Sequence, residues 1–297
     1  MNAVVSEEVQ WRYALLTDIG GQAANYTIDP LTLRQWRLYG GQQGIWVDKQ
    51  RTASLTEDGH GLAVSLLHKG HSYPDDFDAT GVIYHYPVTS RPHARDLGEI
   101  AAVKNCCRLQ VPVFVITVSP GATSKRDVYF GYVTMWDDRA QVFIVEFGLN
   151  ATVLLGKEAD VPFTLHVSEP KGTYEVTSRP HQAAFRIAVV RRYGVQCAVC
   201  EIAVIDVLDA AHLAPKAADG SDDPRNGLLL CALHHRAFDK GLFAIKPDTL
   251  AVVTQQHGPS QAALGITKDA LGHLKAHPDP SALGYCWEKW LKEHGGT

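Results

Sequence analysis

The stretch CAVCEIAVIDVLDAAHLAPKAADGSDDPRNGLLLCALHHRAFD, residues 197–239, carries two pairs of soft metal ligands. Cys197 and Cys200 stand three positions apart, and Cys231 and His234 repeat that spacing further along the chain. Two such knuckles, each giving two ligands from a tight turn, are typical of a tetrahedral structural zinc site. The spacing therefore predicts one structural zinc ion held by these four side chains.

Three more residues in this stretch suggest hydrolytic chemistry. His212 and Asn226 lie between the two knuckles, and His235 directly follows the last predicted zinc ligand. Phosphodiester hydrolysis needs a base that works near neutral pH, as imidazole does, and a divalent cation to stabilise charge on the phosphate. The pattern resembles the HNH nucleases of the ββα-metal fold. That resemblance implies that His212 is the general base, that His235 binds the catalytic metal, and that Asn226 orients the base or its loop.

The local pattern predicts the ββα order. The apolar run 204–208 places His212 at or just after the end of a strand, residues 227–230 form a second strand, and residues 232–239 form a short helix. In this arrangement we expect His235 to face His212 across a cleft that is wide enough for one phosphate.

The chain departs from the family at one position. Many members have an Asp immediately before the base as a metal ligand, whereas this chain has Ala211, so another residue must hold the catalytic metal. Asp239 is four residues after His235, on the same helical face, and is the candidate second ligand. A helix-end residue bonded to backbone or to Lys240 is the alternative. Asp209 is the weaker candidate, because its odd offset along a strand directs it away from His212. Mg²⁺ or Mn²⁺ suits a mixed nitrogen and oxygen site.

The first half of the chain has a different pattern of apolar residues. Short apolar runs at 61–67, 81–86, 111–118, 128–136 and 141–147 are separated by turn residues, which indicates an antiparallel, strongly curved sheet or barrel. Two helices are predicted beside it, at 30–39 and 95–108. The first ten residues show no clear pattern, and we expect an irregular start. The fold class is therefore α+β, a curved sheet with flanking helices followed by the zinc-bound ββα module.

Several segments here resemble, in order, the SRA domain, a PUA-like barrel that reads modified cytosine in DNA. They are GGQQGIWVD (40–48), AVSLLHKGHSYPDDFDATGVIYHYP (63–87), RDLGEIAAVKNC (95–106) with PVFVITV (112–118), and VYFGYVTMWDD (128–138) with FIVEF (143–147). The resemblance implies a pocket for a flipped 5-methyl- or 5-hydroxymethylcytosine, in which aromatic rings stack on the base and a carboxylate reads its edge. Tyr73 and Tyr86 match the stacking residues and Asp76 the acid, with Tyr84 as a rival for the second ring.

These patterns divide the chain into a DNA-binding domain at 1–150, a linker at 151–180 and an endonuclease domain at 181–297 with a helical tail. A helix is predicted from His181 to the first knuckle, and a hairpin after residue 240. The formal net charge of −4 does not exclude DNA, because phosphate attraction is local. The candidate phosphate contacts are Arg186, Arg191, Arg192 and Arg236.

Composition sets the remaining expectations. The chain of 297 residues has no apolar run long enough to span a membrane and no export signal at its start, and its six cysteines suit a reducing cytoplasm. Together the two resemblances imply a type IV modification-dependent restriction endonuclease that acts on double-stranded DNA carrying modified cytosine. Because one such site cuts one strand, a double-strand break would require a homodimer or two independent encounters. Two alternatives stay open: an HNH nuclease or nickase that is indifferent to base modification, and a reader of modified DNA that does not cleave.

Overall fold

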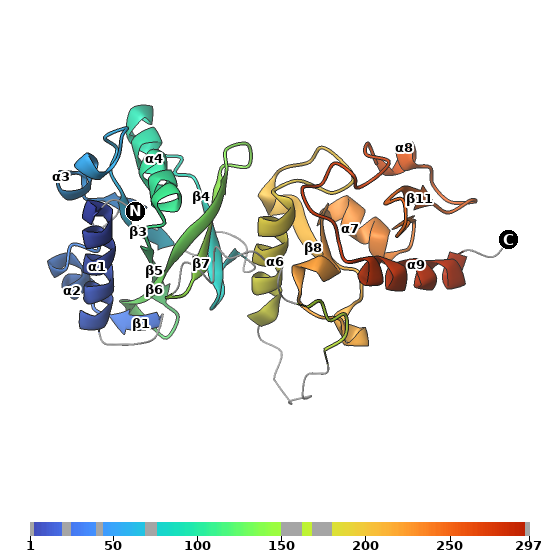
Figure 1. Ribbon diagram of the computed structural model, residues 1–297, viewed down its shortest axis with the longest axis horizontal. Coiled ribbons are helices and arrows are strands. Elements are labelled where there is room, and N and C mark those ends of the chain that lie inside the picture. Colours follow the sequence, from blue (N-terminus) through green and yellow to red (C-terminus); the bar gives the residue numbers. More distant parts are fainter. Residues whose placement is uncertain are drawn as a thin grey trace. The chain divides into compact units, whose positions relative to one another are not determined.

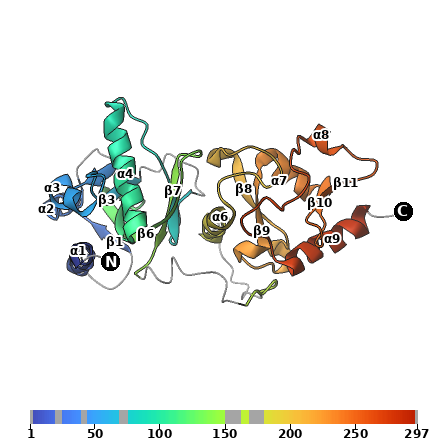
Figure 2. The same ribbon diagram turned by 45° about the horizontal axis from the view of Figure 1, so that its top comes forward.

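The structure is a computed structural model that describes residues 3–19, 25–39, 44–68, 76–149, 162–167 and 180–294. The chain divides into two compact units, residues 1–157 and residues 158–297 (Figures 1 and 2). Tyr73 lies outside the described residues. None of the helices in the described ranges is long and apolar enough to cross a lipid bilayer.

The first unit is built on one mixed sheet. Its strands are β1 (Asn25–Ile28), β2 (Ile45–Val47), β3 (Ala63–His68), β4 (Gly81–His85), β5 (Val113–Ser119), β6 (Ala122–Asp137) and β7 (Val142–Phe147). They run in the order β2-β3-β5-β6-β7-β4, and β1 pairs with one end of the long β6. All five predicted strand segments are confirmed.

The sheet differs from the prediction in one pairing. β3 and β5 run parallel, since the chain between them passes through β4 and the helix α4 (His93–Leu109), so the expectation of a wholly antiparallel sheet was wrong. Among the described strands, β2 and β4 each have a single neighbour, and hydrogen bonds between these strands do not close a barrel.

Helices cover both faces of this sheet. Along β5 the side chains alternate: Val113 and Val115 pack with α4, whereas Phe114 and Ile116 pack with α1 (Ala3–Asp18) and α2 (Pro30–Gln35). Such alternation is the two-residue period of a strand that is buried on both sides. A short helix α3 (Lys49–Thr52) and a 3₁₀ turn (Ala53–Leu55) lead into β3.

The expectation of an irregular N-terminus was wrong, because α1 begins at Ala3. Its buried side includes Arg12, with no exposed surface, and Glu8, which accepts a hydrogen bond from Arg12 Nε at 2.7 Å. Arg12 Nη1 also donates to the carbonyl of Ala63 at 2.7 Å. This guanidinium therefore ties α1 to the sheet, and its buried charge is offset by hydrogen bonds.

The second unit contains the ββα module. Its elements are α6 (Pro180–Tyr193), β8 (Leu208–His212), β9 (Gly227–Cys231), α7 (Ala232–Asp239), β10 (Phe243–Ile245), β11 (Val252–Thr254), α8 (Gln261–Leu264) and α9 (Pro280–His294), with 3₁₀ turns at Ile205–Val207, Lys216–Ala218 and Pro224–Asn226. The predicted helix before the first knuckle, the ββα order and the hairpin β10–β11 are confirmed. The first strand is not at 204–208 as expected, because Ile205–Val207 form a 3₁₀ turn and β8 begins at Leu208. The tail is helical only from Pro280.

Helices α6 and α7 both pack on the β8–β9 hairpin, as Figure 2 shows. The hairpin pairs Leu208 with Cys231 and His212 with Gly227. A side chain at Gly227 would clash with α6, because its Cβ would lie 2.6 Å from the ring of Phe185. This close approach holds the end of β8, and so His212, against α6.

Candidate functional site

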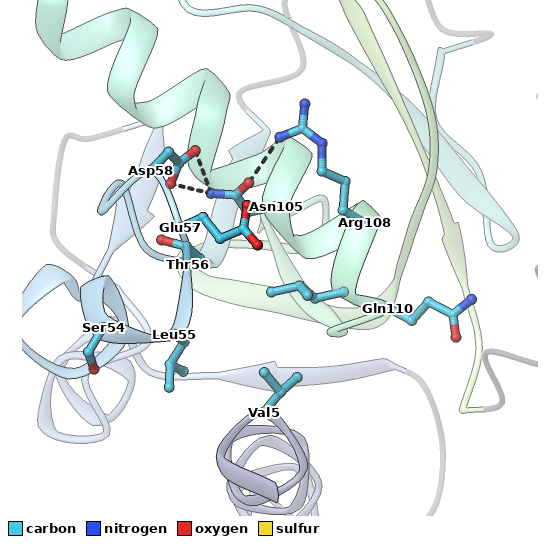
Figure 3. Close-up of a pocket in the computed structure, with 10 residues that line it drawn as sticks. Val5, Ser54, Leu55, Thr56, Glu57, Asp58, Asn105, Arg108 and Gln110 are labelled. Carbon is cyan, nitrogen blue, oxygen red and sulfur yellow. Dashed lines mark hydrogen bonds between the residues drawn. The ribbon is translucent and has the colours of Figure 1, made fainter. Parts of the chain in front are cut away.

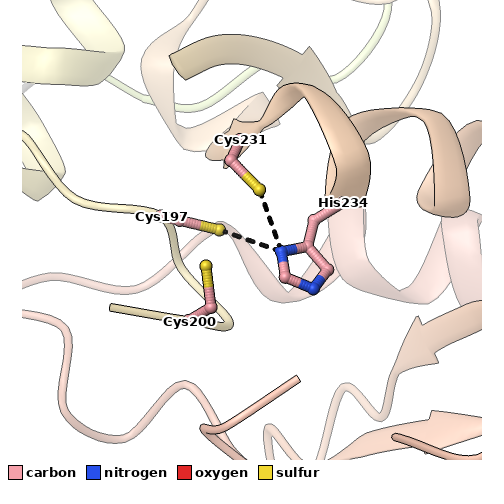
Figure 4. A group of neighbouring side chains, drawn as sticks. All are labelled: Cys197, Cys200, Cys231 and His234. Carbon is pink, nitrogen blue, oxygen red and sulfur yellow. Dashed lines mark hydrogen bonds between the residues drawn. The ribbon is translucent and has the colours of Figure 1, made fainter. Parts of the chain in front are cut away.

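The four predicted zinc ligands converge on one point (Figure 4). One ligand atom from each of Cys197, Cys200, Cys231 and His234 lies within 4.8 Å of all the others, and all four residues are buried. His234 Nδ1 is 3.1 Å from the sulfur of Cys231 and 3.5 Å from that of Cys197. The group therefore joins the turn before β8, the end of β9 and the first turn of α7.

The surroundings of the cluster favour metal binding. His234 Nε2 lies 3.1 Å from the carbonyl oxygen of Leu264, which can only accept, so Nε2 carries the proton and Nδ1 presents its lone pair to the sulfurs. Burial lowers the pKa of His234 and raises that of Cys200, so neither residue carries charge at neutral pH without a cation. Three thiols and one imidazole in a closed tetrahedral set are the donors that zinc prefers.

His212 is the last residue of β8, and its imidazole is held on two sides. Its ring stacks on Phe185 with centroids 3.7 Å apart and planes 10° apart. Its Nε2 lies 2.9 Å from Asp222 Oδ1, and the other oxygen of Asp222 is 2.8 Å from Lys216 Nζ. These contacts fix both the plane and the direction of the imidazole.

Asp222 also sets the tautomer of His212. Burial acts to raise the pKa of Asp222, but hydrogen bonds from His212 and Lys216 lower it overall. The carboxylate is therefore ionised at neutral pH and can only accept, so the proton of neutral His212 stays on Nε2. Nδ1 is left with a free lone pair, as a general base requires. Asp222 was not predicted; the available signal was the group of three acidic residues between His212 and Asn226.

Asn226 is fully buried and holds the loop that follows His212. Its Oδ1 accepts from the amide of Ala214 at 2.9 Å, and its Nδ2 donates to the carbonyls of Ala214 and Ser221 at 3.0 and 2.9 Å. A Cβ at Gly220 would lie 1.9 Å from the Ala214 carbonyl oxygen, so the loop closes tightly on itself. Asn226 therefore acts on the loop that delivers Asp222.

His235 lies on α7 between two carboxylates. Its Nδ1 is 3.3 Å from Asp209 Oδ2, and its Nε2 is 3.7 Å from Asp239 Oδ2. These three residues line a cavity of about 410 Å³ together with Arg236, which is exposed there. The two carboxylates therefore lie on opposite nitrogens of the imidazole, one on each side of the ring.

The two histidines line separate cavities. His212 belongs to a smaller cavity of about 110 Å³, and His235 to the larger one, but Asp239 lines both. Asp209 is on the opposite side of β8 from His212, as its odd offset predicts, and that side is the one that α7 covers. Its contact with His235 was missed, because its position was judged against His212 alone.

The four candidate arginines differ in their exposure to solvent. Arg186 is only 6% exposed and donates to the carbonyls of Leu208 and Ile205 at 3.2 and 2.7 Å, so its assignment as a phosphate contact was wrong. The apolar face of α6 and the start of β8 enclose it. Arg192 is half-buried and donates to the carbonyl of His277 at 2.7 Å, and Arg191 is half-buried as well. Arg236 is the exposed candidate.

In the first unit, Asp76 is fully buried and its Oδ2 lies 3.6 Å from His85 Nε2. Tyr86 is 9% exposed, packs its ring on Phe143 with centroids 4.4 Å apart, and donates its hydroxyl to Asp138 at 2.9 Å. Its rival Tyr84 is also buried, with its hydroxyl on the carbonyl of Gly44 at 2.9 Å.

A separate cavity of about 810 Å³ opens beside α4 in this unit (Figure 3). Asn105 on its wall donates to both oxygens of Asp58, at 2.9 and 3.0 Å, and accepts from Arg108 at 3.0 Å. These polar groups satisfy one another, and neither Asp76 nor Tyr86 lines the cavity.

Replacing Asp222 by asparagine is expected to slow any hydrolysis that uses His212 as its base on the order of 10²-fold, because the charge that stabilises protonated His212 is lost. The pKa of Asp222 lies below its ordinary 3.8, so the contact persists above that value and is lost only as pH falls through the lowered pKa. Asp222 is therefore ionised throughout the neutral range, and its own titration does not change the deficit there. Hydrolysis rates at several pH values measure it. Asp223→Asn is the matched control, since Asp223 pairs with Arg225 instead; an equal loss there would count against this role.

Comparison with known proteins identifies one family in the second unit. No curated protein matches the chain. Among solved structures, it is similar to the modification-dependent TagI restriction endonuclease (23% identity, 91% of this chain and 94% of that chain, TM-score 0.34). It is also similar to KRYPTONITE in complex with mCHG DNA and SAH (16% identity, 49% of this chain and 38% of that chain, TM-score 0.28). A third similar structure is the type IV phosphorothioation-dependent restriction endonuclease ScoMcrA (13% identity, 93% of this chain and 56% of that chain, TM-score 0.29). The family described as HNH endonuclease matches residues 197–246. These residues, which contain all four ligands of the cluster together with His212, Asn226 and His235, therefore form an HNH endonuclease domain.

Proposed function

We propose that the protein is a modification-dependent DNA endonuclease, which binds 5-methyl- or 5-hydroxymethylcytosine with its first unit and hydrolyses phosphodiester bonds with its HNH domain. The observation that carries the proposal is the pair of histidines on the β8–β9–α7 module. His212 has its base nitrogen set by Asp222, and His235 lies between two carboxylates. A base and a cation site joined by Asp239 are the two components that phosphodiester hydrolysis requires.

In the proposed reaction, His212 Nδ1 takes a proton from a water molecule as the water oxygen attacks phosphorus. The bond from phosphorus to the 3′ oxygen breaks, the 3′ oxygen leaves with a proton from solvent, and the product carries a 5′ phosphate. A divalent cation, Mg²⁺ or Mn²⁺, supplies charge stabilisation for the phosphate and the leaving oxygen. Asp222 stabilises the imidazolium that forms on His212.

The two nitrogens of His235 suggest different roles for its neighbours. A ring nitrogen that binds a cation is usually opposed by one that donates to a carboxylate. Nδ1 is within hydrogen-bonding distance of Asp209, so Asp209 is the orienting partner. Nε2 and Asp239 are farther apart, and Asp239 also reaches the His212 cavity, so these two groups are the proposed cation ligands.

Asp239→Asn is expected to raise the Mn²⁺ concentration for half-maximal cleavage by roughly 100-fold, and Asp209→Asn by roughly tenfold, because the first removes a ligand and the second an orienting contact. Titration of cleavage with Mn²⁺ gives both values. Asp248→Asn, on the exposed turn after β10, should leave the titration unchanged. A larger effect at Asp209 than at Asp239 would reverse the two assignments.

The four-ligand cluster has a different task in this proposal. A structural zinc at Cys197, Cys200, Cys231 and His234 would leave no open position for substrate, because the protein supplies all four ligands. It therefore fixes the start of α7, and with it His235, relative to β8. One site of this kind cuts one strand, so a homodimer is the proposed form for double-strand cleavage.

The proposal for the first unit rests on Tyr73, Asp76 and Tyr86, as the SRA resemblance assigns them. Asp76 supports it, because a buried carboxylate near an imidazole is suited to bind the amino edge of cytosine. The packing of Tyr86 on Phe143 favours the second candidate, an HNH nuclease or nickase that does not distinguish modified DNA.

One experiment separates these functions. A plasmid prepared with cytosine, 5-methylcytosine or 5-hydroxymethylcytosine is incubated with the protein in Mg²⁺ and then in Mn²⁺. Preferential cutting of a modified plasmid is the expected result, and Asp76→Asn is expected to reduce that preference at least tenfold without changing zinc content. Equal cutting of all three plasmids would establish the indifferent nuclease. No cutting with either cation would leave only a reader of DNA.

A further inference from the structure

The cavity that contains His212 is completed by a helix outside the HNH endonuclease domain. Four residues of α9 line it, and they are Cys286, Lys289, Trp290 and Glu293. The family match ends at residue 246, whereas α9 begins at Pro280. At about 110 Å³ the space is large enough for several water molecules.

Helix α9 is fixed to the module at both of its ends. Trp290 Nε1 donates to the carbonyl of Gly241 at 2.7 Å, directly after α7. Gly241 has φ +63°, and a Cβ there would lie 2.5 Å from His294 Nε2, so this turn and the end of α9 are in close contact. At the start of α9, the amide of Asp279 donates to the carbonyl of Arg225 at 2.9 Å. The position of α9 relative to His212 is therefore set by several independent contacts.

Lys289 is distinguished by its charge. It is the only lysine or arginine among the described residues that line this cavity, and its side chain is exposed. The other charges of the cavity already have partners: Asp239 lies near His235, Glu293 is 3.8 Å from His294, and His212 is bonded to Asp222. No ion pair involves Lys289 in the described part of the chain. Its ammonium group is therefore available to an anion that enters from solvent.

We propose that Lys289 binds an oxygen of the DNA phosphate that lies next to His212, so that α9 supplies a substrate contact to the HNH site. This inference rests on the proposed nuclease function. A phosphate within reach of a water on His212 would enter the same cavity as the ammonium group. Lysine is suited to this contact, because its ammonium group is a compact charge with three donors.

The test compares three variants on the plasmid that the wild-type protein cuts best. Lys289→Ala is expected to lower the single-turnover cleavage rate at subsaturating enzyme by roughly tenfold, the effect of one charged contact. It should also reduce the slope of log affinity against log salt by about 0.9, the value for one phosphate contact on duplex DNA. Lys289→Arg should retain most of the rate. Lys292→Ala removes an exposed lysine of the same helix that does not line the cavity, and it should behave as wild type.

Zinc content and thermal unfolding establish that each variant is folded, and the salt slope distinguishes a lost phosphate contact from a general disturbance. A Lys289→Ala protein with the wild-type rate and salt slope overturns the contact while the nuclease function stands. An equal loss in Lys292→Ala also overturns it, because the effect would then belong to the charge of the helix as a whole. A wild-type protein that cuts no DNA would overturn both the proposed function and the proposed Lys289–phosphate contact.

Discussion

The His212→Ala protein is expected to cleave DNA about 10² to 10⁴ times more slowly than wild type, because a general base contributes a factor of that size. The remaining activity would come from water activated by solvent alone. Binding of DNA should persist, since the substitution leaves the proposed phosphate contact and the proposed cation ligands in place. Single-turnover cleavage in saturating Mn²⁺ measures the chemical step without interference from product release.

The same substitution also removes the ring that stacks on Phe185, so a structural cause must be separated from a chemical one. Added imidazole should restore part of the rate if His212 acts as a base, and it would restore nothing if the loss came from misfolding. His273→Ala is the matched control, because His273 is an exposed histidine whose Nδ1 lies 3.1 Å from the carbonyl oxygen of Ala270, away from His212. A His212→Ala rate within threefold of wild type would remove the residue from the mechanism.

The HNH domain was predictable because its information is local. The spacing of Cys197, Cys200, Cys231 and His234 places four soft donors on two turns, and the structure brings them together. The helix predicted at 232–239 has the same bounds as α7, since a strand ending in Cys231 and a glycine at 241 leave little freedom. Short-range signals of this kind do not depend on the rest of the fold.

The features that were missed depend on contacts between distant residues. The start of α1 shows no clear apolar pattern, but its Glu8 is buried against Arg12 in the core. Arg186 read as a surface charge, although two carbonyls near the start of β8 satisfy it. Both cases follow one physical rule: a charged side chain can be buried when hydrogen bonds offset the loss of hydration, and a sequence does not show those partners.

Asp222 and Asp209 illustrate the same limit within the site. Asp222 reaches His212 only because Asn226 folds the intervening loop back on itself. Asp209 reaches His235 because α7 packs on the side of β8 that is opposite to His212. Alternation along the strand correctly directed Asp209 away from His212, but the position of α7 decided what it contacts. The two histidines could be identified from sequence, whereas the carboxylates that orient them could not.

Loss of the zinc cluster is expected to have the largest effect on stability. Wild-type protein should contain one zinc per chain, and Cys200→Ser should contain almost none and lose the cooperative unfolding of its second unit. Structural zinc contributes about 10 to 16 kcal/mol in small domains, which equals or exceeds the whole stability of about 5 to 15 kcal/mol of a typical domain. Metal analysis and a thermal scan monitored by circular dichroism measure both quantities.

The reason lies in what the four ligands connect. Cys197 and Cys200 precede β8, Cys231 ends β9, and His234 links α7 to the carbonyl of Leu264. Without a cation these buried thiols have no ionised partner, and burial raises the pKa of Cys197 to about 12. Cys107→Ser makes the same atomic change at a half-buried cysteine of the first unit and should leave zinc and unfolding unchanged. Addition of Mn²⁺ should not restore folding of Cys200→Ser, because the cation proposed for His235 and Asp239 binds at another site. A folded, zinc-free Cys200→Ser protein that still cleaves DNA would show that the cluster has no structural role.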